Sequence, residues 1–141
     1  MKILVAVDGS PNSLRAVKYA IKFANELRSE SSITLINVHD DIPLNLVKRF
    51  TGKKAVREYL TEISYKELKP SLRALNLSAI KHNAIIEFGH IATTICTILK
   101  KERFDLLIVG AKGRSSIADL ALGSVSQRVV ALASSPVLLV K

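Results

Sequence analysis

The stretch Leu106-Leu-Ile-Val-Gly-Ala-Lys-Gly113 joins a run of four apolar residues to two closely spaced glycines. Further along, Gly123-Ser124 completes the spacing G-x2-G-x9-G-[ST]. A short apolar run closed by glycine is typical of a buried strand, and glycines leave backbone N–H groups accessible to an anion because no Cβ stands in the way. This stretch therefore predicts a strand followed by a loop that cradles a phosphate group.

The opening segment Ile3-Leu-Val-Ala-Val-Asp-Gly-Ser10 has the same organisation. Residues 2–7 predict a strand buried on both faces, which ends at Asp8. Ser10 is a good N-cap and Pro11 suits the first helical position, so a helix is expected to follow. Apolar residues recur in it at three- and four-residue steps, at Leu14, Val17, Ile21 and Ala24, and this face is expected to pack on the sheet.

Strands and helices are expected to alternate along the rest of the chain. The expected strands are 32–38, 79–88, 105–109 and 136–140, and the expected helices are 91–101 and one from about Ser124. Residues 44–75 are mostly compatible with a helix that has Val56, Leu60, Ile63 and Leu68 on one side, although Thr51-Gly52 and Pro70 interrupt the pattern. The helix after Ser124 is expected to bury Val125, Val129 and Leu132 on one face.

This alternation requires right-handed crossovers, and hence a mostly parallel sheet covered on both faces. We predict a doubly wound, Rossmann-like α/β fold with a five-stranded parallel sheet in the order 3-2-1-4-5. Ligands in such folds bind beyond the carboxyl ends of the strands, where the strand order reverses. Asp8 and Gly110 follow the two strands that flank this point, so their loops are expected to line one crevice.

The chain length of 141 residues suits a single domain over residues 1–141 that buries a core without disulfides or metals. No apolar run approaches the roughly 20 residues of a membrane span, and residues 3–7 are too few for a signal-peptide core. Cys96 is the only cysteine, which excludes an internal disulfide and suits the reducing cytosol. We expect a soluble, cytoplasmic protein with a buried, inert thiol.

The formal net charge of +9 is distributed unevenly. Residues 48–81 carry nine basic and three acidic side chains, whereas residues 1–47 carry five of each. A basic segment of this kind can contact an acidic partner or a nucleic acid, but it lacks interleaved aromatic residues and any nucleic-acid motif. A solvated helical face is therefore the favoured interpretation, and a nucleic-acid partner is not expected.

Several segments also resemble a known family. They are the opening segment 3–10, Asp105-Leu-Leu-Ile-Val-Gly-Ala-Lys-Gly-Arg-Ser-Ser116, Leu120-Ala-Leu-Gly-Ser-Val-Ser-Gln-Arg-Val129 and Ser135-Pro-Val-Leu-Leu-Val-Lys141. Together they closely resemble the universal stress protein family, over nearly the whole chain and least in residues 40–78. The resemblance implies a five-stranded parallel α/β fold, a cytoplasmic location, a homodimer and, for the branch that keeps the glycine motif, binding of ATP.

The resemblance also implies which residues contact the nucleotide. It places Gly113, Gly123, Ser124, Val125 and Ser126 at the phosphates, Gly110 at the ribose region with Ala111 next to it, and Asp8 by the ribose or a metal ion. The backbone at Val38 would recognise adenine, and Ala6 and Val7 would form a wall of the pocket. The physical chemistry agrees, because a helix that begins near Ser124 presents unpaired N–H groups to phosphate oxygens and the two serine hydroxyls add donors.

Charged residues near this motif allow two interpretations each. Lys112 and Arg114 can neutralise phosphate charge or can be ordinary solvated loop residues. Asp8 can cap the first helix or can hold Mg²⁺ through water. His39 and His90 follow strands, but the sequence places no acidic residue to orient either one, so both are expected at the surface or outside direct ligand contact.

The leading hypothesis is an ATP-binding regulatory protein, a homodimeric switch or sensor. Neither a Walker lysine motif nor G-x-G-x-x-G is present and no general base can be assigned, so hydrolysis is expected to be slow or absent. The alternatives are a weak ATPase and a nucleotide-free interaction module that uses residues 48–73. The apolar segment 136–141 is expected at the sheet edge, where it would pair with its copy in a homodimer.

Overall fold

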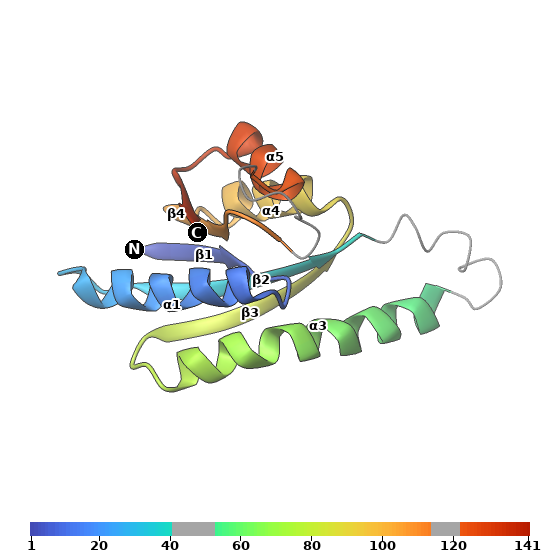
Figure 1. The fold of residues 1–141 in the computed structure, drawn as a ribbon, viewed down its shortest axis with the longest axis horizontal. Helices are drawn as coiled ribbons and strands as arrows, with labels where there is room; N and C mark the ends of the chain where they lie inside the picture. Colours follow the sequence, from blue (N-terminus) through green and yellow to red (C-terminus); the bar gives the residue numbers. More distant parts are fainter. Residues whose placement is uncertain (41–52, 114–121) are drawn as a thin grey trace.

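A five-stranded parallel sheet forms the centre of the molecule (Figure 1). The computed structural model describes residues 1–40, 53–113 and 122–141. The elements in chain order are β1 (Lys2–Ala6), α1 (Pro11–Glu26), β2 (Ser32–His39), α3 (Lys53–Asn76), β3 (Lys81–Phe88), α4 (Ile91–Lys101), β4 (Leu106–Gly110), α5 (Ser124–Leu132) and β5 (Val137–Val140). The strand order is β3-β2-β1-β4-β5 and every pair is parallel, which confirms the predicted doubly wound fold.

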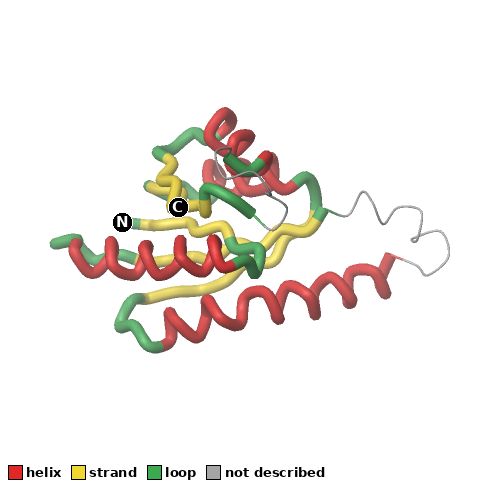
Figure 2. Tube along the Cα trace, in the orientation of Figure 1, coloured by secondary structure: helices red, strands yellow, loops and turns green. Residues whose placement is uncertain are grey.

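Helices cover both faces of this sheet, with α1 and α3 on one side and α4 and α5 on the other (Figures 1 and 2). Successive side chains of a strand point to opposite faces, so each strand supplies both layers of the core. In β1, Ile3 and Val5 pack with α1 and α3, whereas Leu4 packs with α4 and α5. This burial on both faces explains the continuous apolar runs in the sequence.

Helix α1 begins and packs as its sequence indicates. The Ser10 side chain accepts a hydrogen bond from the Ser13 N–H at 3.1 Å, and Pro11 occupies the first helical turn. The face against the sheet consists mainly of small residues, because Ser13, Ala16, Ala20 and Ala24 are buried with Val17. The predicted contacts Leu14 and Ile21 lie at the margin of this face and are only half-buried.

Some sequence-based expectations about the helices were wrong. Pro70 lies inside α3 and does not end it, because it is on the exposed side of the helix, where a carbonyl left without a partner can face water. Leu132 of α5 is 53% exposed, whereas Val129 is fully buried as predicted. Thr51-Gly52, the other expected interruption, lies outside the described residues.

No helix in the described part of the chain is long and apolar enough to cross a membrane. Cys96 on α4 is half-buried, and its Sγ atom lies 3.9 Å from the Val129 carbonyl of α5. Burial raises the pKa of the Cys96 thiol, which favours the unreactive protonated form.

Candidate functional site

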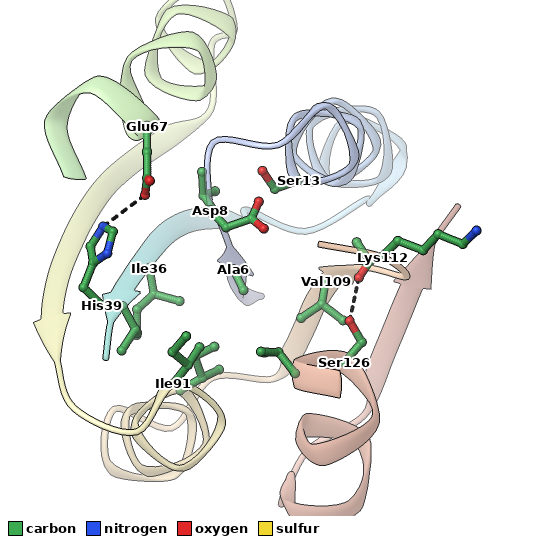
Figure 3. A pocket seen from close by; sticks show the side chains of 15 residues that line it. Ala6, Asp8, Ser13, Ile36, His39, Glu67, Ile91, Val109, Lys112 and Ser126 are labelled. Atoms are coloured by element: carbon green, nitrogen blue, oxygen red, sulfur yellow. Dashed lines mark hydrogen bonds and ion pairs between the residues drawn. The ribbon is translucent and has the colours of Figure 1, made fainter. Parts of the chain in front are cut away.

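A cleft of about 360 Å³ opens at the carboxyl ends of the strands, where β1 separates β2 from β4. This volume lies in the range of small-molecule sites. Fifteen residues line it, and they are Ala6, Val7, Asp8, Ser13, Ile36, Val38, His39, Glu67, Ile91, Ile95, Val109, Gly110, Lys112, Val125 and Ser126. Polar side chains lie at both ends of the cleft, with apolar ones such as Ala6, Ile36, Ile91 and Val109 between them (Figure 3).

The loop after β4 closely approaches the end of β1. A Cβ atom on Gly113 would lie 3.1 Å from Asp8 Oδ2, and one on Gly123 would lie 3.3 Å from the Gly113 nitrogen. Both contacts are tighter than ordinary van der Waals distance. A side chain at either position would therefore press into the segment that approaches the cleft, which explains glycine there.

Helix α5 starts at this loop with an uncapped N-terminus. Gly123 is the N-cap residue and offers no side-chain hydrogen bond, while its own N–H donates to the Ala111 carbonyl at 2.9 Å. The first intrahelical bond here is from the Gln127 N–H to the Gly123 carbonyl at 2.9 Å. The N–H groups of the first turn, Ser124 to Ser126, therefore have no acceptor within the helix and form an electropositive end.

The two serines of this turn differ in their surroundings. The buried Ser126 hydroxyl donates to the Gly110 carbonyl at 2.8 Å, so its proton is used within the protein and not offered to a ligand. Ser124 is exposed. Of the two hydroxyl donors expected from the sequence, the Ser126 hydroxyl therefore has the backbone as its partner, and only its N–H is without an acceptor within the helix.

Asp8 stabilises a turn and also lines the cleft. Its Oδ1 accepts the Ser10 N–H at 3.0 Å, which stabilises the turn into α1, and its Oδ2 lies next to Gly113 in the cleft. Within the described residues, no group of three or more His, Cys, Asp or Glu side chains is placed to hold a metal ion. A magnesium ion at Asp8 would need phosphate oxygens and water for its other ligands, as is usual for this ion.

The structure brings most of the predicted residues together. Ala6, Val7, Asp8, Val38, Gly110, Lys112, Val125 and Ser126 line the cleft, and Ala111, Gly113, Gly123 and Ser124 belong to its adjoining loop and helix start. Arg114 lies outside the described residues. Val125, expected on the buried face of α5, contributes to the cleft wall and is partly exposed.

The end of the cleft near α3 was not foreseen. His39 lines it with a side chain only 13% exposed, and its Nε2 lies 3.1 Å from Glu67 Oε2 (Figure 3). His39 was expected at the surface or outside direct ligand contact, because the sequence indicates no acidic residue placed to orient it. Glu67 comes from another element, so only the packing of α3 against the sheet reveals the pair. His90, in contrast, is exposed and lies outside the cleft, with Nε2 2.9 Å from Arg128 Nη1.

A doubly wound parallel sheet with a ligand-sized cleft at its switch point defines a Rossmann-like α/β protein of the kind that binds small molecules. The chain belongs to the universal stress protein family, whose family model matches residues 1–141. The universal stress protein MJ0531 of Methanocaldococcus jannaschii is 33% identical over 99% of this chain and 81% of its own length.

Solved structures show the same relationship. The structure of MJ0577, from the same organism, has a TM-score of 0.86 and 27% identity, and the match covers 99% of this chain and 94% of that one. A universal stress family protein of Arabidopsis thaliana, solved with AMP bound, has a TM-score of 0.70 at 23% identity and covers 100% and 91% of the two chains. At this identity, the second likeness supports the fold alone.

Proposed function

We propose that this protein is an ATP-binding regulatory member of the universal stress protein family. It would act in the cytoplasm as a single-domain homodimeric switch or sensor with little or no hydrolysis. The observation that carries the proposal is that the glycine loop, the Asp8 carboxylate and the uncapped start of α5 all meet at one apolar cleft. A protein of the same fold from Arabidopsis thaliana has been solved with AMP bound, so this fold can hold an adenine nucleotide.

The two chemical parts of a nucleotide match different parts of the cleft. Phosphates are favoured near the first turn of α5, where N–H groups and the helix dipole coincide, and Lys112 in the adjoining lining can supply positive charge. The flat, weakly polar base suits the apolar side chains between the two ends, with the Val38 backbone as its proposed hydrogen-bonding partner. Asp8 lies between these parts, where a ribose or a magnesium ion bound to phosphate would be found.

Regulation follows from where the ligand would bind. The cleft touches residues of β1, β2, α3, α4, β4 and α5, so a bound nucleotide would tie together elements that are distant in the sequence. A ligand shifts a conformational equilibrium by its difference in affinity for the two states. We propose that occupancy in this way changes the surface that the dimer presents to partners.

The nucleotide itself provides the first test. Purified protein is heated, and the supernatant is chromatographed for released ATP, ADP or AMP; ligand-free protein is then titrated calorimetrically with Mg-ATP. We expect saturable binding with one nucleotide per chain. Failure to bind any adenine nucleotide, combined with polyanion binding that falls steeply with salt, would instead support the interaction module based on residues 48–73.

Hydrolysis is tested separately. Wild type is expected to hydrolyse ATP no faster than Asp8→Ala at steady state. The reason is that we identify no side chain among the described residues as a general base that would activate water for attack on the phosphate. A wild-type rate well above that of the variant would support the weak ATPase.

The homodimer is proposed to form through residues 136–141. β5 lies at the edge of the sheet. The carbonyl of Pro136, just before β5, accepts the Leu107 N–H at 3.0 Å, and the Val140 carbonyl accepts the Ala111 N–H at 2.7 Å. Because hydrogen-bonding direction alternates along a strand, the backbone groups of Val137 and Leu139 point to the open side. Exposed Val130 and Leu132 on neighbouring α5 add apolar surface for a second copy to cover.

A proline at this edge tests the dimer. Leu139→Pro removes an N–H that points away from β4 and is expected to give a monomer at micromolar concentration by analytical ultracentrifugation. Leu139→Ala keeps the N–H and is the matched control that should remain dimeric. A wild-type monomer at micromolar concentration, or a dimeric Leu139→Pro variant, would contradict pairing through this edge.

A further inference from the structure

We infer that Glu67 is a specificity-determining residue that accepts a hydrogen bond from a donor group on the nucleoside part of the bound nucleotide. The inference rests on the proposed nucleotide site and extends it to the end of the cleft near α3. The donor is of one chemical kind, an N–H or O–H group. It can come from an exocyclic amine of the base or from a ribose hydroxyl.

Glu67 is held in place by buried neighbours. The Asn37 side chain, only 1% exposed, donates from Nδ2 to Glu67 Oε2 at 2.8 Å and also to the Val7 carbonyl at 2.8 Å. His39 Nε2 approaches the same carboxylate oxygen at 3.1 Å. Asn37 therefore links the end of β1 to the α3 carboxylate, and the Glu67 side chain, 9% exposed, occupies a defined position in the cleft lining.

Gly9 allows this approach of α3 to the cleft. It has a φ of +78°, and a Cβ atom there would lie 2.8 Å from Glu67 Cγ. The turn after β1 therefore accommodates the Glu67 side chain only because residue 9 has none. The carboxylate reaches the carboxyl ends of the strands over this glycine.

The chemistry of a carboxylate decides what it selects. An ionised carboxylate only accepts hydrogen bonds, and its two oxygens together offer about four acceptor positions, so a ligand donor can add to the bond from Asn37. A carbonyl or phosphate oxygen in the same place would face like partial charge and gain no hydrogen bond. Phosphates therefore belong near Lys112 and α5, and a donor of the nucleoside belongs at Glu67.

One further atom agrees with a site that a ligand completes. Asn37 Oδ1 is buried and forms no hydrogen bond with the described residues. Asn37 cannot gain by reversing its amide, because Oδ1 would then face the Val7 carbonyl and the Glu67 carboxylate. Buried polar atoms without partners are uncommon in proteins, and this one belongs to the side chain that holds Glu67.

The test compares nucleotide analogues that each lack one donor. Wild type, Glu67→Gln and Glu67→Asp are titrated with ATP, inosine triphosphate, 2′-deoxy-ATP and 3′-deoxy-ATP, and their melting temperatures confirm folding. Wild type is expected to bind one analogue roughly 10- to 100-fold more weakly than ATP, since a buried charged acceptor loses its donor. In Glu67→Gln this ratio should fall to within a few-fold of one, because an amide can both donate and accept.

The responding analogue identifies the source of the donor: the inosine nucleotide reports the base amine, and the deoxy nucleotides report a ribose hydroxyl. Glu62→Gln on the exposed side of α3 is the matched control and should keep every wild-type ratio. Unchanged ratios in both Glu67 variants, with ATP binding by wild type intact, would overturn the role of Glu67 alone. A wild type that binds no nucleotide would overturn the proposed function as well.

Discussion

The glycine-rich end of the cleft and its Glu67 end differ in the groups they present and in how far apart these groups lie in the sequence. At the glycine end, the backbone of residues 110–113 and 123–126 supplies most of the polar groups. At the other end, the side chains of Asn37, His39 and Glu67 do so, and Asn37 and Glu67 are separated by 30 positions. Backbone groups suit any phosphate, whereas a carboxylate requires a donor, so the first end would supply affinity and the second would supply selectivity.

The largest expected effect tests the glycine end. Gly113→Val combined with Gly123→Val should lower affinity for Mg-ATP by about 100-fold or more, nearly 3 kcal/mol, because both side chains would press into the segment beside Asp8. Isothermal titration measures the loss. Ala55→Val on the exposed side of α3 is the control and should bind like wild type. Equal affinity for Mg-ATP in the double variant and wild type would show that the glycine loop does not contribute to the binding site.

Gly9→Ala tests the other end through stability. A non-glycine residue at a φ of +78° is strained, and the new Cβ would meet Glu67 Cγ, so we expect a loss of about 1–2 kcal/mol in unfolding free energy. Urea denaturation measures this loss. The same substitution in a Glu67→Ala background should cost less if the contact contributes. An equal cost in both backgrounds would assign the loss to backbone strain alone.

Lys112→Ala tests the contribution of charge at the glycine end by removing the one lysine side chain among the described cleft-lining residues. We expect a 3- to 10-fold loss of affinity for ATP, about 1 kcal/mol, and a smaller loss for AMP, which carries fewer phosphate charges. The difference should shrink at high salt because exposed charges are screened. Lys100→Ala, on exposed α4 surface, is the control. An equal loss for ATP and AMP would place the lysine away from the terminal phosphates.

The smallest expected effect of nucleotide concerns Cys96, which lies next to the cleft residue Ile95 but contacts α5. Burial raises the pKa of the Cys96 thiol, so a smaller fraction of it is ionised at neutral pH. Because the thiolate is the reactive form, modification by a thiol reagent should be slow. We expect the native rate to be about 10-fold below the rate in urea, to rise with pH, and to change little with ATP. A strong effect of nucleotide would show that α4 and α5 separate when the cleft is filled.

Much of the fold was predictable because it depends on local patterns. Ser10 and Pro11 mark the start of α1, and short apolar runs mark the five strands, since strands covered on both faces need apolar side chains throughout. Pro70 shows the limit of such reasoning. Its effect on α3 depends on whether carbonyls left without a partner can reach water, and that depends on which side of the helix faces the sheet.

The glycine end of the cleft was predictable for a similar reason. This end is built from β4 with Gly110, then Gly113, and then Gly123 at the start of α5. These features lie close together in the sequence, so their spacing indicates how they are arranged. The direction of the Ser126 hydroxyl was not predictable, because its partner is the Gly110 carbonyl of the neighbouring strand end. The prediction that Leu132 is buried was wrong, because the spacing of apolar residues along a helix does not distinguish a face that packs on the sheet from one that stays exposed in the monomer.

The parallel α/β layering, the family and the backbone-built end of the cleft can be inferred from the sequence alone, since each depends on periodicity or on residues close together in the chain. The contact of Glu67 of α3 with Asn37 and His39 over Gly9 is visible only in the folded molecule. That contact depends on the register and depth at which a long helix packs against the sheet. No local pattern encodes this packing, because it arises from the summed fit of side chains contributed by several elements.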